Sequence, residues 1–264
     1  MSPLLAVAVE AARAAGRIQR ERFRTPFAVR RKGAVDLVTE VDLACEEAIR
    51  EVLARLAPGT AVLGEEAGAT GTGADRWIVD PLDGTTNYAH GFPVFCTSIA
   101  WEEGGAVRLG AIYDPLRDEL FTVEQGSGAR LDGEPVRTSA TAELGDALLA
   151  TGFPYDRGTR PRNYEEFREF TQRTQGVRRG GSAALDLAYV ACGRLDGFWE
   201  PGLQPWDLAA GCLLVCEAGG AVTGYGGGPF SPYDADVAAS NGPLHGALLQ
   251  VLAGTPRPDT APSL

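Results

Sequence analysis

The chain has 264 residues, 44% of them hydrophobic, which is enough for one large domain or two small ones that share an interface. It carries 24 Lys and Arg against 35 Asp and Glu, a net charge of −11, so binding to a nucleic-acid backbone is not expected. No apolar run approaches the roughly 18 residues of a membrane span, and the N-terminus lacks the pattern of a signal peptide, so we expect a cytoplasmic protein with no membrane contact.

The first half of the chain predicts two helices followed by a β-rich stretch. Apolar residues recur at helical spacing over residues 3–24 and 40–56, and Thr39 with Asp42 resembles the capping box that begins a helix. We expect strands at residues 77–79, 94–102, 106–113, 118–124 and 129–131, the second and third of them joined as a hairpin. Helices followed by such a meander predict an α+β subdomain over residues 1–140.

After about residue 140, predicted strands and helices alternate. We expect strands at residues 147–151, near 177, at 195–200 and at 236–240. We expect helices at residues 163–175, 182–192, 205–218 and 243–253. Because this alternation is typical of α/β folds, we expect a second subdomain over residues 141–264, with a cleft between the two.

The segment from residue 77 to residue 92 carries the most informative pattern. Asp80 directly follows an apolar strand, Pro81 interrupts the hydrogen-bond ladder of that strand, and Asp83 comes three residues later. The two carboxylates, with the Leu82 carbonyl between them, form an all-oxygen set of the kind that Mg²⁺ prefers. This segment alone therefore predicts a metal site.

Gly84 and Thr85 continue this segment and open what we expect to be a short helix. Free N–H groups at a helix start can bind phosphate oxygens, so the same segment can hold a metal and an anion. The alternative is an Asx-type turn with an ordinary helix cap, because Asp-Pro, Asp-Gly and Thr are all turn formers. The segment by itself gives the two interpretations about equal support.

Two distant features favour the metal site. Glu65 and Glu66 follow the apolar residues 61–63, which we expect to form a further strand, and Asp207 falls in the first turn of an apolar helix. Each has an ordinary explanation on its own, as a solvated acidic turn or as a residue favoured by the helix dipole. Together with Asp80 and Asp83, they place carboxylates on two strand ends and a helix start. The sequence therefore predicts a divalent-metal site built from distant segments.

The cysteines and histidines have no part in this predicted site. Five cysteines at scattered spacings argue against a disulfide framework, and we expect Cys212 and Cys216, four apart on a helix, to be buried thiols. His90 and His245 lie outside the carboxylate set, so a phosphohistidine mechanism is not expected.

With these motifs combined, the chain resembles the inositol monophosphatase family over residues 4 to 253. The matching segments are Val35–Thr39 with Asp42, Gly64–Glu66, Asp80–Tyr88, and Trp206–Gly211 leading to Glu217–Gly220. The resemblance implies the layered αβαβα sandwich of the inositol monophosphatase and fructose-1,6-bisphosphatase type. It also implies a Mg²⁺-dependent phosphatase, commonly a homodimer and in many members inhibited by lithium.

The resemblance implies a metal role for several matched residues. The implied ligands of two Mg²⁺ ions, or three, with Mn²⁺ as a substitute, are Glu65, Asp80, the Leu82 carbonyl, Asp83 and Asp207. Asp80 is implied to bridge two ions, and Thr85 with Glu65 to orient the attacking water. Two ions about 3.5–4 Å apart can stabilise both the attacking and the leaving oxygen, so no covalent phospho-enzyme is needed.

The resemblance also implies the residues that contact the substrate. These are Asp83, Gly84, Thr85, Gly181, Ser182, Ala183, Glu200 and Asp207. Lys32, in a short basic run, is a further candidate that can face the phosphate, although a solvated charge run is its ordinary explanation.

The expected reaction is hydrolysis of a small phosphate monoester, with myo-inositol 1-phosphate the first candidate because Glu200 favours a polyol. The alternatives within the superfamily are fructose 1,6-bisphosphate, 3′-phosphoadenosine 5′-phosphate and histidinol phosphate. Gln204 leaves the choice open, since some inositol-specific relatives carry His at this place. An alternative of another class is a regulatory binding protein of the transcription machinery.

Overall fold

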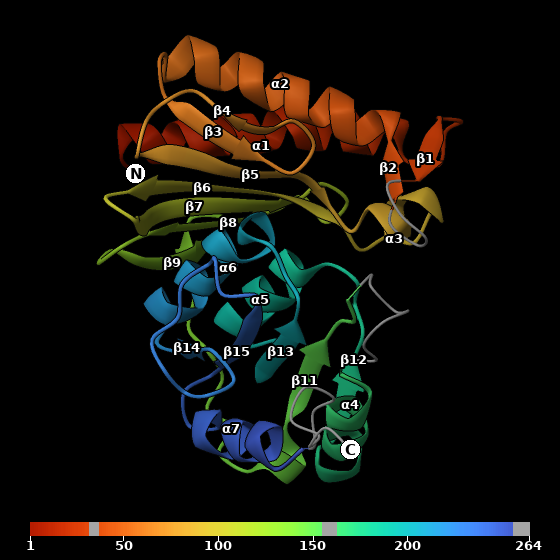
Figure 1. The fold of residues 1–264 in the computed structure, drawn as a ribbon, viewed down its shortest axis with the longest axis vertical. Coiled ribbons are helices and arrows are strands. Elements are labelled where there is room, and N and C mark those ends of the chain that lie inside the picture. The colour runs from red at the N-terminus through yellow and green to blue at the C-terminus, as the bar shows by residue number, and fades with distance from the viewer. Residues whose placement is uncertain (32–36, 155–162, 256–264) are drawn as a thin grey trace, which may run out of the picture.

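The computed structural model describes residues 1–31, 37–154 and 163–255, and its helices and sheets stack in layers (Figure 1). Lys32 and the first part of the Val35–Thr39 motif lie outside the described residues. No helix in the described ranges is long and apolar enough to cross a membrane.

An eight-stranded sheet occupies the N-terminal half. Its spatial order is β10-β9-β8-β7-β6-β5-β3-β4, and only the β3–β5 pair is parallel. The strands are β3 (Ala61–Gly64), β4 (Gly68–Thr70), β5 (Arg76–Asp83), β6 (Cys96–Glu103), β7 (Ala106–Asp114), β8 (Glu119–Glu124), β9 (Gly128–Leu131) and β10 (Glu134–Pro135). β6 and β7 form the predicted hairpin, and its two turn glycines, Gly104 and Gly105, both have a left-handed backbone conformation.

Helices α1 (Pro3–Arg22) and α2 (Glu40–Leu56) cover one face of this sheet. The predicted capping box is present, because the Thr39 side chain accepts from the first turn of α2 while Asp42 accepts from the Thr39 backbone. A two-stranded ribbon, β1 (Val29–Arg31) with β2 (Leu37–Thr39), precedes α2, and the short helix α3 (Thr85–Ala89) follows β5.

A five-stranded sheet occupies the C-terminal half, in the order β12-β11-β13-β15-β14. Its strands are β11 (Leu148–Thr151), β12 (Gly176–Arg178), β13 (Gly197–Pro201), β14 (Ala221–Thr223) and β15 (Asp236–Ser240). A short 3-10 turn, η1 (Leu144–Asp146), precedes β11. Strand β11 runs parallel to both of its neighbours, and β15 antiparallel to both of its own.

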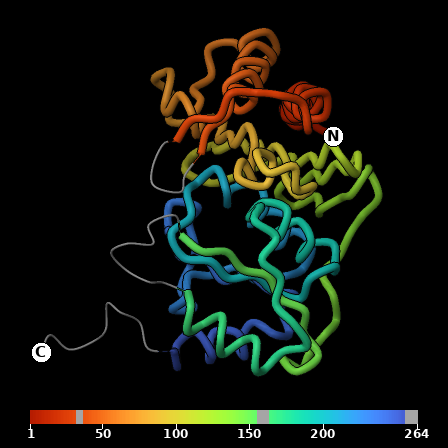
Figure 2. The backbone as a smooth tube through the Cα atoms, turned by 90° about the vertical axis from the view of Figure 1, so that its right-hand side faces the viewer, coloured from red at the N-terminus to blue at the C-terminus, as the bar shows by residue number. Residues whose placement is uncertain are grey.

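Two apolar helices, α5 (Ala183–Ala191) and α6 (Pro205–Glu217), fill the space between the sheets and bury residues against both. Helices α4 (Tyr164–Arg173) and α7 (His245–Gly254) cover the outer face of the smaller sheet. The layers therefore follow the order helix, sheet, helix, sheet, helix, as the side view of Figure 2 also shows. This arrangement confirms the expected αβαβα sandwich.

The structure differs from the expectations at a few places. The sequence did not predict the strands β1, β2, β4, β10 and β14, which have only two or three residues each. The expectation that both Cys212 and Cys216 are buried is half wrong: Cys212 is buried, but Cys216 lies on the exposed side of the last turn of α6. The proposed subdomain boundary near residue 140 falls between β10 and β11, and α5 and α6 belong to the core on both sides of it.

Candidate active site

Three carboxylates from distant parts of the chain meet at the end of β5. Asp80 and Asp83 lie in the second half of that strand, and Asp207 lies in the first turn of α6. One oxygen of each carboxylate lies within 4.8 Å of the corresponding oxygens of the other two. The structure thus brings together the aspartates that the sequence singled out, in an all-oxygen cluster suited to a hard cation.

The local backbone explains how Asp80 and Asp83 face the same way. The register of β5 against β6 shifts between these two residues, where Pro81 interrupts the ladder. The Leu82 N–H donates to Asp80 Oδ1 at 2.9 Å, which is an Asx-type turn. The turn that the sequence offered as an alternative to the metal site is therefore present, and it helps to form the carboxylate cluster.

Glu65 follows β3, which is parallel to β5, so its side chain starts from the same end of the sheet. It is not one of the three clustered carboxylates, but it lies close enough to raise the pKa of both Asp80 and Asp207. Glu65 is half-buried, and its role as a metal ligand stays a prediction.

Burial is the largest cause of the raised pKa at each clustered aspartate. At Asp80 the charges of Glu65, Asp83 and Asp207 add to it, and at Asp207 the charge of Asp83 is the next cause. Several like charges in a buried site are unfavourable unless a cation or protons balance them. The donor set, the burial and the mutual repulsion all fit a divalent cation.

Asp83 is held in place from the other half of the molecule. Its Oδ2 accepts hydrogen bonds from the Ser182 hydroxyl and from the Ala184 N–H, both at 2.7 Å. The thiol of Cys96 is a weaker donor at 3.9 Å. These bonds lower the pKa of Asp83 and only partly offset the rise that burial causes. Because both strong bonds go to Oδ2, Oδ1 is left for a cation.

The segment that the resemblance assigned to the substrate surrounds this contact. Gly181 precedes α5 with a left-handed φ of +84°, Ser182 is the N-cap of that helix, and Ala183 is its first residue. The structure places the Ser182 hydroxyl on Asp83, so its visible function is to orient a candidate metal ligand. Substrate contacts by these three residues stay a prediction.

Thr85 lies beside the cluster and bonds to Asp42, which the sequence indicated as a helix-capping residue and as part of a matched family motif, but not as a site residue. Its hydroxyl is 2.8 Å from Asp42 Oδ1 and 3.1 Å from the Leu82 carbonyl. The other oxygen of Asp42, Oδ2, accepts the Thr39 N–H at 2.9 Å. A capping carboxylate uses one oxygen and leaves the second available, and this was the signal that could have identified Asp42 from the sequence.

Gly84 separates the carboxylates from Thr85 and must be glycine. It has a left-handed φ of +99°, and a Cβ there would lie 2.9 Å from the Val94 carbonyl oxygen. The turn at Gly84, which is the N-cap, allows α3 to begin only two residues after Asp83. The first N–H groups of this helix have no partner within it.

Glu200, on β13, is buried on the C-terminal side of the site. A Cβ on Gly152 would lie 2.1 Å from Glu200 Oε1, so the absence of a side chain at Gly152 makes room for this carboxylate. Burial first, and then the charge of Asp186, raise the pKa of Glu200 to about 8. Asp83 contributes to the same rise, which connects Glu200 to the aspartate cluster.

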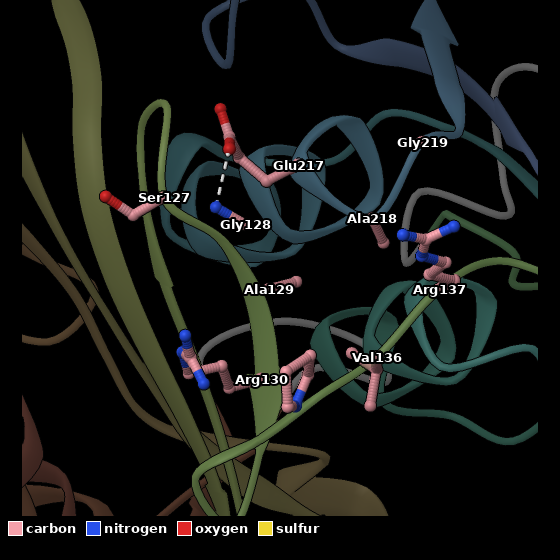
Figure 3. Close-up of a pocket in the computed structure, with 10 residues that line it drawn as sticks. Ser127, Gly128, Ala129, Arg130, Val136, Arg137, Glu217, Ala218 and Gly219 are labelled. Carbon is pink, nitrogen blue, oxygen red and sulfur yellow. Dashed lines mark hydrogen bonds between the residues drawn. The ribbon is translucent and has the colours of Figure 1, made fainter.

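A cavity of about 360 Å³ lies elsewhere, between the β9–β10 hairpin and the end of α6 (Figure 3). It is lined by none of the predicted site residues. Glu217, at its edge, accepts hydrogen bonds from the Gly126 and Gly128 N–H groups at 2.8 and 3.0 Å. This part of the matched Glu217–Gly220 motif therefore fixes the turn between β8 and β9.

Comparison with known proteins supports the resemblance to the inositol monophosphatase family. A sequence model of the inositol monophosphatase family matches residues 1–256. An inositol-1-monophosphatase from Synechocystis is 46% identical over 96% of this chain and 90% of its own length. A Nus factor SuhB from Pseudomonas aeruginosa is 44% identical over all of this chain and 99% of its own length.

A solved structure of an inositol monophosphatase from Anabaena superimposes on the fold with a TM-score of 0.88. It is 44% identical and covers 98% of both chains. The match of the family model to nearly the whole sequence and the agreement of the folds lead to one conclusion: this chain belongs to the inositol monophosphatase family.

Proposed function

We propose that this chain is a Mg²⁺-dependent phosphatase that hydrolyses myo-inositol 1-phosphate to inositol and phosphate. The observation that carries the proposal is the cluster of Asp80, Asp83 and Asp207 within 4.8 Å, beside the hydrogen bond between Thr85 and Asp42. The relative from Synechocystis, named an inositol-1-monophosphatase, supports the choice of substrate.

The metal ligands in this proposal follow the donor set. Glu65, Asp80 and the Leu82 carbonyl would hold a first Mg²⁺, and Asp80, Asp83 and Asp207 a second. We propose two or three ions per subunit, with Mn²⁺ as a substitute. When bound, such ions activate a water molecule and neutralise charge on the phosphate and the leaving oxygen.

Thr85 and Asp42 would orient the attacking water. When the Thr85 hydroxyl donates to Asp42 Oδ1, the lone pairs of its oxygen are free to accept a hydrogen bond from the water. Burial raises the pKa of Asp42, which makes this carboxylate a better proton acceptor than an exposed aspartate. Glu65, whose charge acts on Asp80 and Asp207, would share the task of orientation.

The phosphate and the alcohol would be bound by different elements. The N–H groups of Gly84 and Thr85, at the start of α3, would donate to phosphate oxygens. Glu200 would accept hydrogen bonds from hydroxyl groups of the leaving polyol. Gly181, Ser182 and Ala183 would line the same side of the substrate, and we call these four residues the substrate wall.

A substrate panel tests the proposal. Phosphate release is measured from myo-inositol 1-phosphate, fructose 1,6-bisphosphate, 3′-phosphoadenosine 5′-phosphate and histidinol phosphate, with Mg²⁺ and with EDTA. We expect the highest kcat/KM for the inositol ester and no turnover in EDTA. Absence of metal-dependent turnover on every polyol phosphate would refute the proposal. The Asp83→Asn variant serves as the control for hydrolysis by contaminants.

A second candidate function is regulatory binding to the transcription machinery. It is motivated by the relative from Pseudomonas aeruginosa, which is named a Nus factor. Expression of Asp83→Asn in a strain that lacks the gene separates the two functions. If the catalytically inactive variant restores growth and transcription as well as the wild type does, binding is the main function. If it does not, hydrolysis is.

We further propose that the protein is a homodimer that lithium inhibits, as the family resemblance implies, and that it is cytoplasmic, as expected from a sequence without a membrane span or a signal-peptide pattern. Light scattering, cell fractionation and phosphate release in the presence of lithium chloride measure them independently. A monomer in light scattering would refute the first of these properties without affecting the other two.

A further inference from the structure

The side chain of Asn87 joins the two halves of the candidate site. Asn87 lies in α3, one turn after the aspartates of β5. Its amide nitrogen donates to the Val94 carbonyl at 2.7 Å, to the Gly180 carbonyl at 2.9 Å and, more weakly, to the Gly181 carbonyl at 3.3 Å. The last two acceptors belong to the segment that enters α5, which is far away in the sequence.

The acceptors around Asn87 fix the orientation of its side-chain amide. All three partners are backbone carbonyl oxygens, which only accept, so the nitrogen of the amide must face them. Gly181 has a left-handed φ of +84°, and a Cβ there would lie 3.0 Å from the Asn87 amide nitrogen. The backbone therefore approaches Asn87 more closely than a residue with a side chain would allow.

A second contact fixes the other end of the same segment. Ser182 and Ala184 both donate to Asp83 Oδ2 at 2.7 Å. Segment 180–184 is thus held at two places, and both partners, Asp83 and Asn87, belong to the short stretch that carries the candidate metal ligands. Its position relative to the carboxylate cluster is set by these two residues.

We propose that Asn87 is a positioning residue for the substrate: through Gly180 and Gly181 it holds segment 180–184 at the distance from the metal cluster that the phosphate ester requires. The inference rests on the proposed function, in which residues 181–183 line the substrate. Asn87 itself touches neither the clustered carboxylates nor, in this proposal, the substrate. Its loss should therefore weaken substrate binding and leave metal binding intact.

The Asn87→Asp variant tests this in the full-length protein. It keeps the shape of the side chain and replaces the donor with an oxygen that the three carbonyls repel. We expect KM for myo-inositol 1-phosphate to rise about tenfold or more, with kcat within about threefold of the wild type. We expect the affinity for Mn²⁺, measured by titration calorimetry without substrate, to change by less than about twofold.

Asn241→Asp is the matched control. Asn241 is another bridging asparagine, whose amide nitrogen donates to the Ser139 hydroxyl at 2.9 Å and the Thr141 carbonyl at 2.7 Å. It joins the end of β15 to the segment between β10 and η1, and these two bonds involve neither the clustered carboxylates nor segment 180–184. We expect this variant to lower Tm by an amount comparable to Asn87→Asp and to leave KM unchanged. Asn87→Ala, which removes the donor without adding repulsion, covers the case in which Asn87→Asp does not fold.

The outcomes separate the inference from the proposed function. Normal wild-type turnover with an unchanged KM in a folded Asn87 variant overturns the inference alone. A fall in kcat and in Mn²⁺ affinity together with a rise in KM also overturns it, since Asn87 would then act on the carboxylate cluster or on the fold as a whole. If the wild type hydrolyses no ester of the panel, the proposed function fails, and the inference fails with it.

Discussion

Replacing Asp207 with Asn should stabilise the metal-free protein and remove most of its activity. Asp207 lies within 4.8 Å of Asp80 and Asp83, and burial together with the charge of Asp83 raises its pKa. The Asn side chain keeps an oxygen that can accept the Gln204 N–H, which now bonds to Asp207 at 2.7 Å. The helix cap can therefore persist, and the main change is the loss of one negative charge.

The distance between the carboxylate oxygens gives the size of the expected gain in stability. Two unit charges 4.8 Å apart repel by about 3.5 kcal/mol at an effective dielectric constant of about 20. Burial and mutual repulsion raise the pKa of these carboxyl groups, which favours their neutral forms, so the full repulsion is an upper limit. Loss of the charge from the first turn of α6 removes roughly 0.3–1 kcal/mol of dipole stabilisation. We expect a net gain of about 1–2 kcal/mol at pH 8, or about 2–8 °C in Tm.

The sign of the pH dependence follows from the raised pKa. A carboxyl group whose pKa is higher in the folded than in the unfolded state adds stability at low pH, and that stability is lost as the pH rises through the folded value. The advantage of Asp207→Asn should therefore be larger at pH 8 than at pH 5. Thermal unfolding in EDTA at both pH values measures it.

Activity and metal binding should decrease in Asp207→Asn, although the metal-free protein becomes more stable. We expect kcat to fall by about 10²–10³, because Asp207 is a proposed charged ligand of Mg²⁺. We also expect Mg²⁺ to raise Tm less than in the wild type. Glu165→Gln, which removes an acidic residue from the first turn of α4, is the control and should not raise Tm. A lower metal-free Tm for Asp207→Asn, or undiminished stabilisation by Mg²⁺, would refute the reasoning.

Three further variants test other parts of the site. Burial raises the pKa of Glu200 from 4.5 to about 8, so wild-type stability should decrease as the pH rises through this range, and Glu200→Gln should flatten the dependence of Tm on pH in EDTA; an unchanged slope would contradict this. Thr85→Val removes the hydroxyl that donates to Asp42, and we expect steady-state kinetics to show kcat lower by about 10²-fold with KM nearly constant; a wild-type kcat would count against a role in orienting water. Gln19→Met removes the amide that donates to the Pro81 carbonyl at 2.7 Å, between the two aspartates of β5, so calorimetry should show several-fold weaker Mn²⁺ binding. It also removes a buried amide oxygen that has no partner among the described residues, so Tm should change by less than about 3 °C.

The elements that the sequence predicted well are those whose limits are encoded locally. The expected helix over residues 40–56 matches α2, because a capping box begins it and Pro58-Gly59 follows its end. Most strands of two or three residues, β12 excepted, were not predicted, since alternation cannot be recognised over so few positions. Their pairing depends on a neighbour: β14, for example, is defined by its antiparallel contact with β15.

The site shows the same division between local and distant information. The sequence indicated Asp80, Asp83 and Asp207 by their places at a strand end and a helix start, and the structure brings these three together. It did not indicate that Asp42 bonds to Thr85, because that contact depends on how α2 packs beside β5. Hydrogen bonds between segments more than 40 residues apart follow from tertiary packing, which composition and spacing do not encode.

The stretch from Asp80 to Asn87 both contributes to the carboxylate cluster and binds the segment that leads into α5. Asp83 belongs to the carboxylate cluster and also binds the start of α5 through its Oδ2. Asn87 binds the backbone just before that helix. Any change that separates α5 from this stretch therefore alters the carboxylate cluster and the proposed substrate wall together. For this reason substitutions at Asp83 should affect metal and substrate affinity jointly, whereas those at Asn87 should affect substrate affinity alone, and comparison of the two variants measures how strongly the halves of the site are coupled.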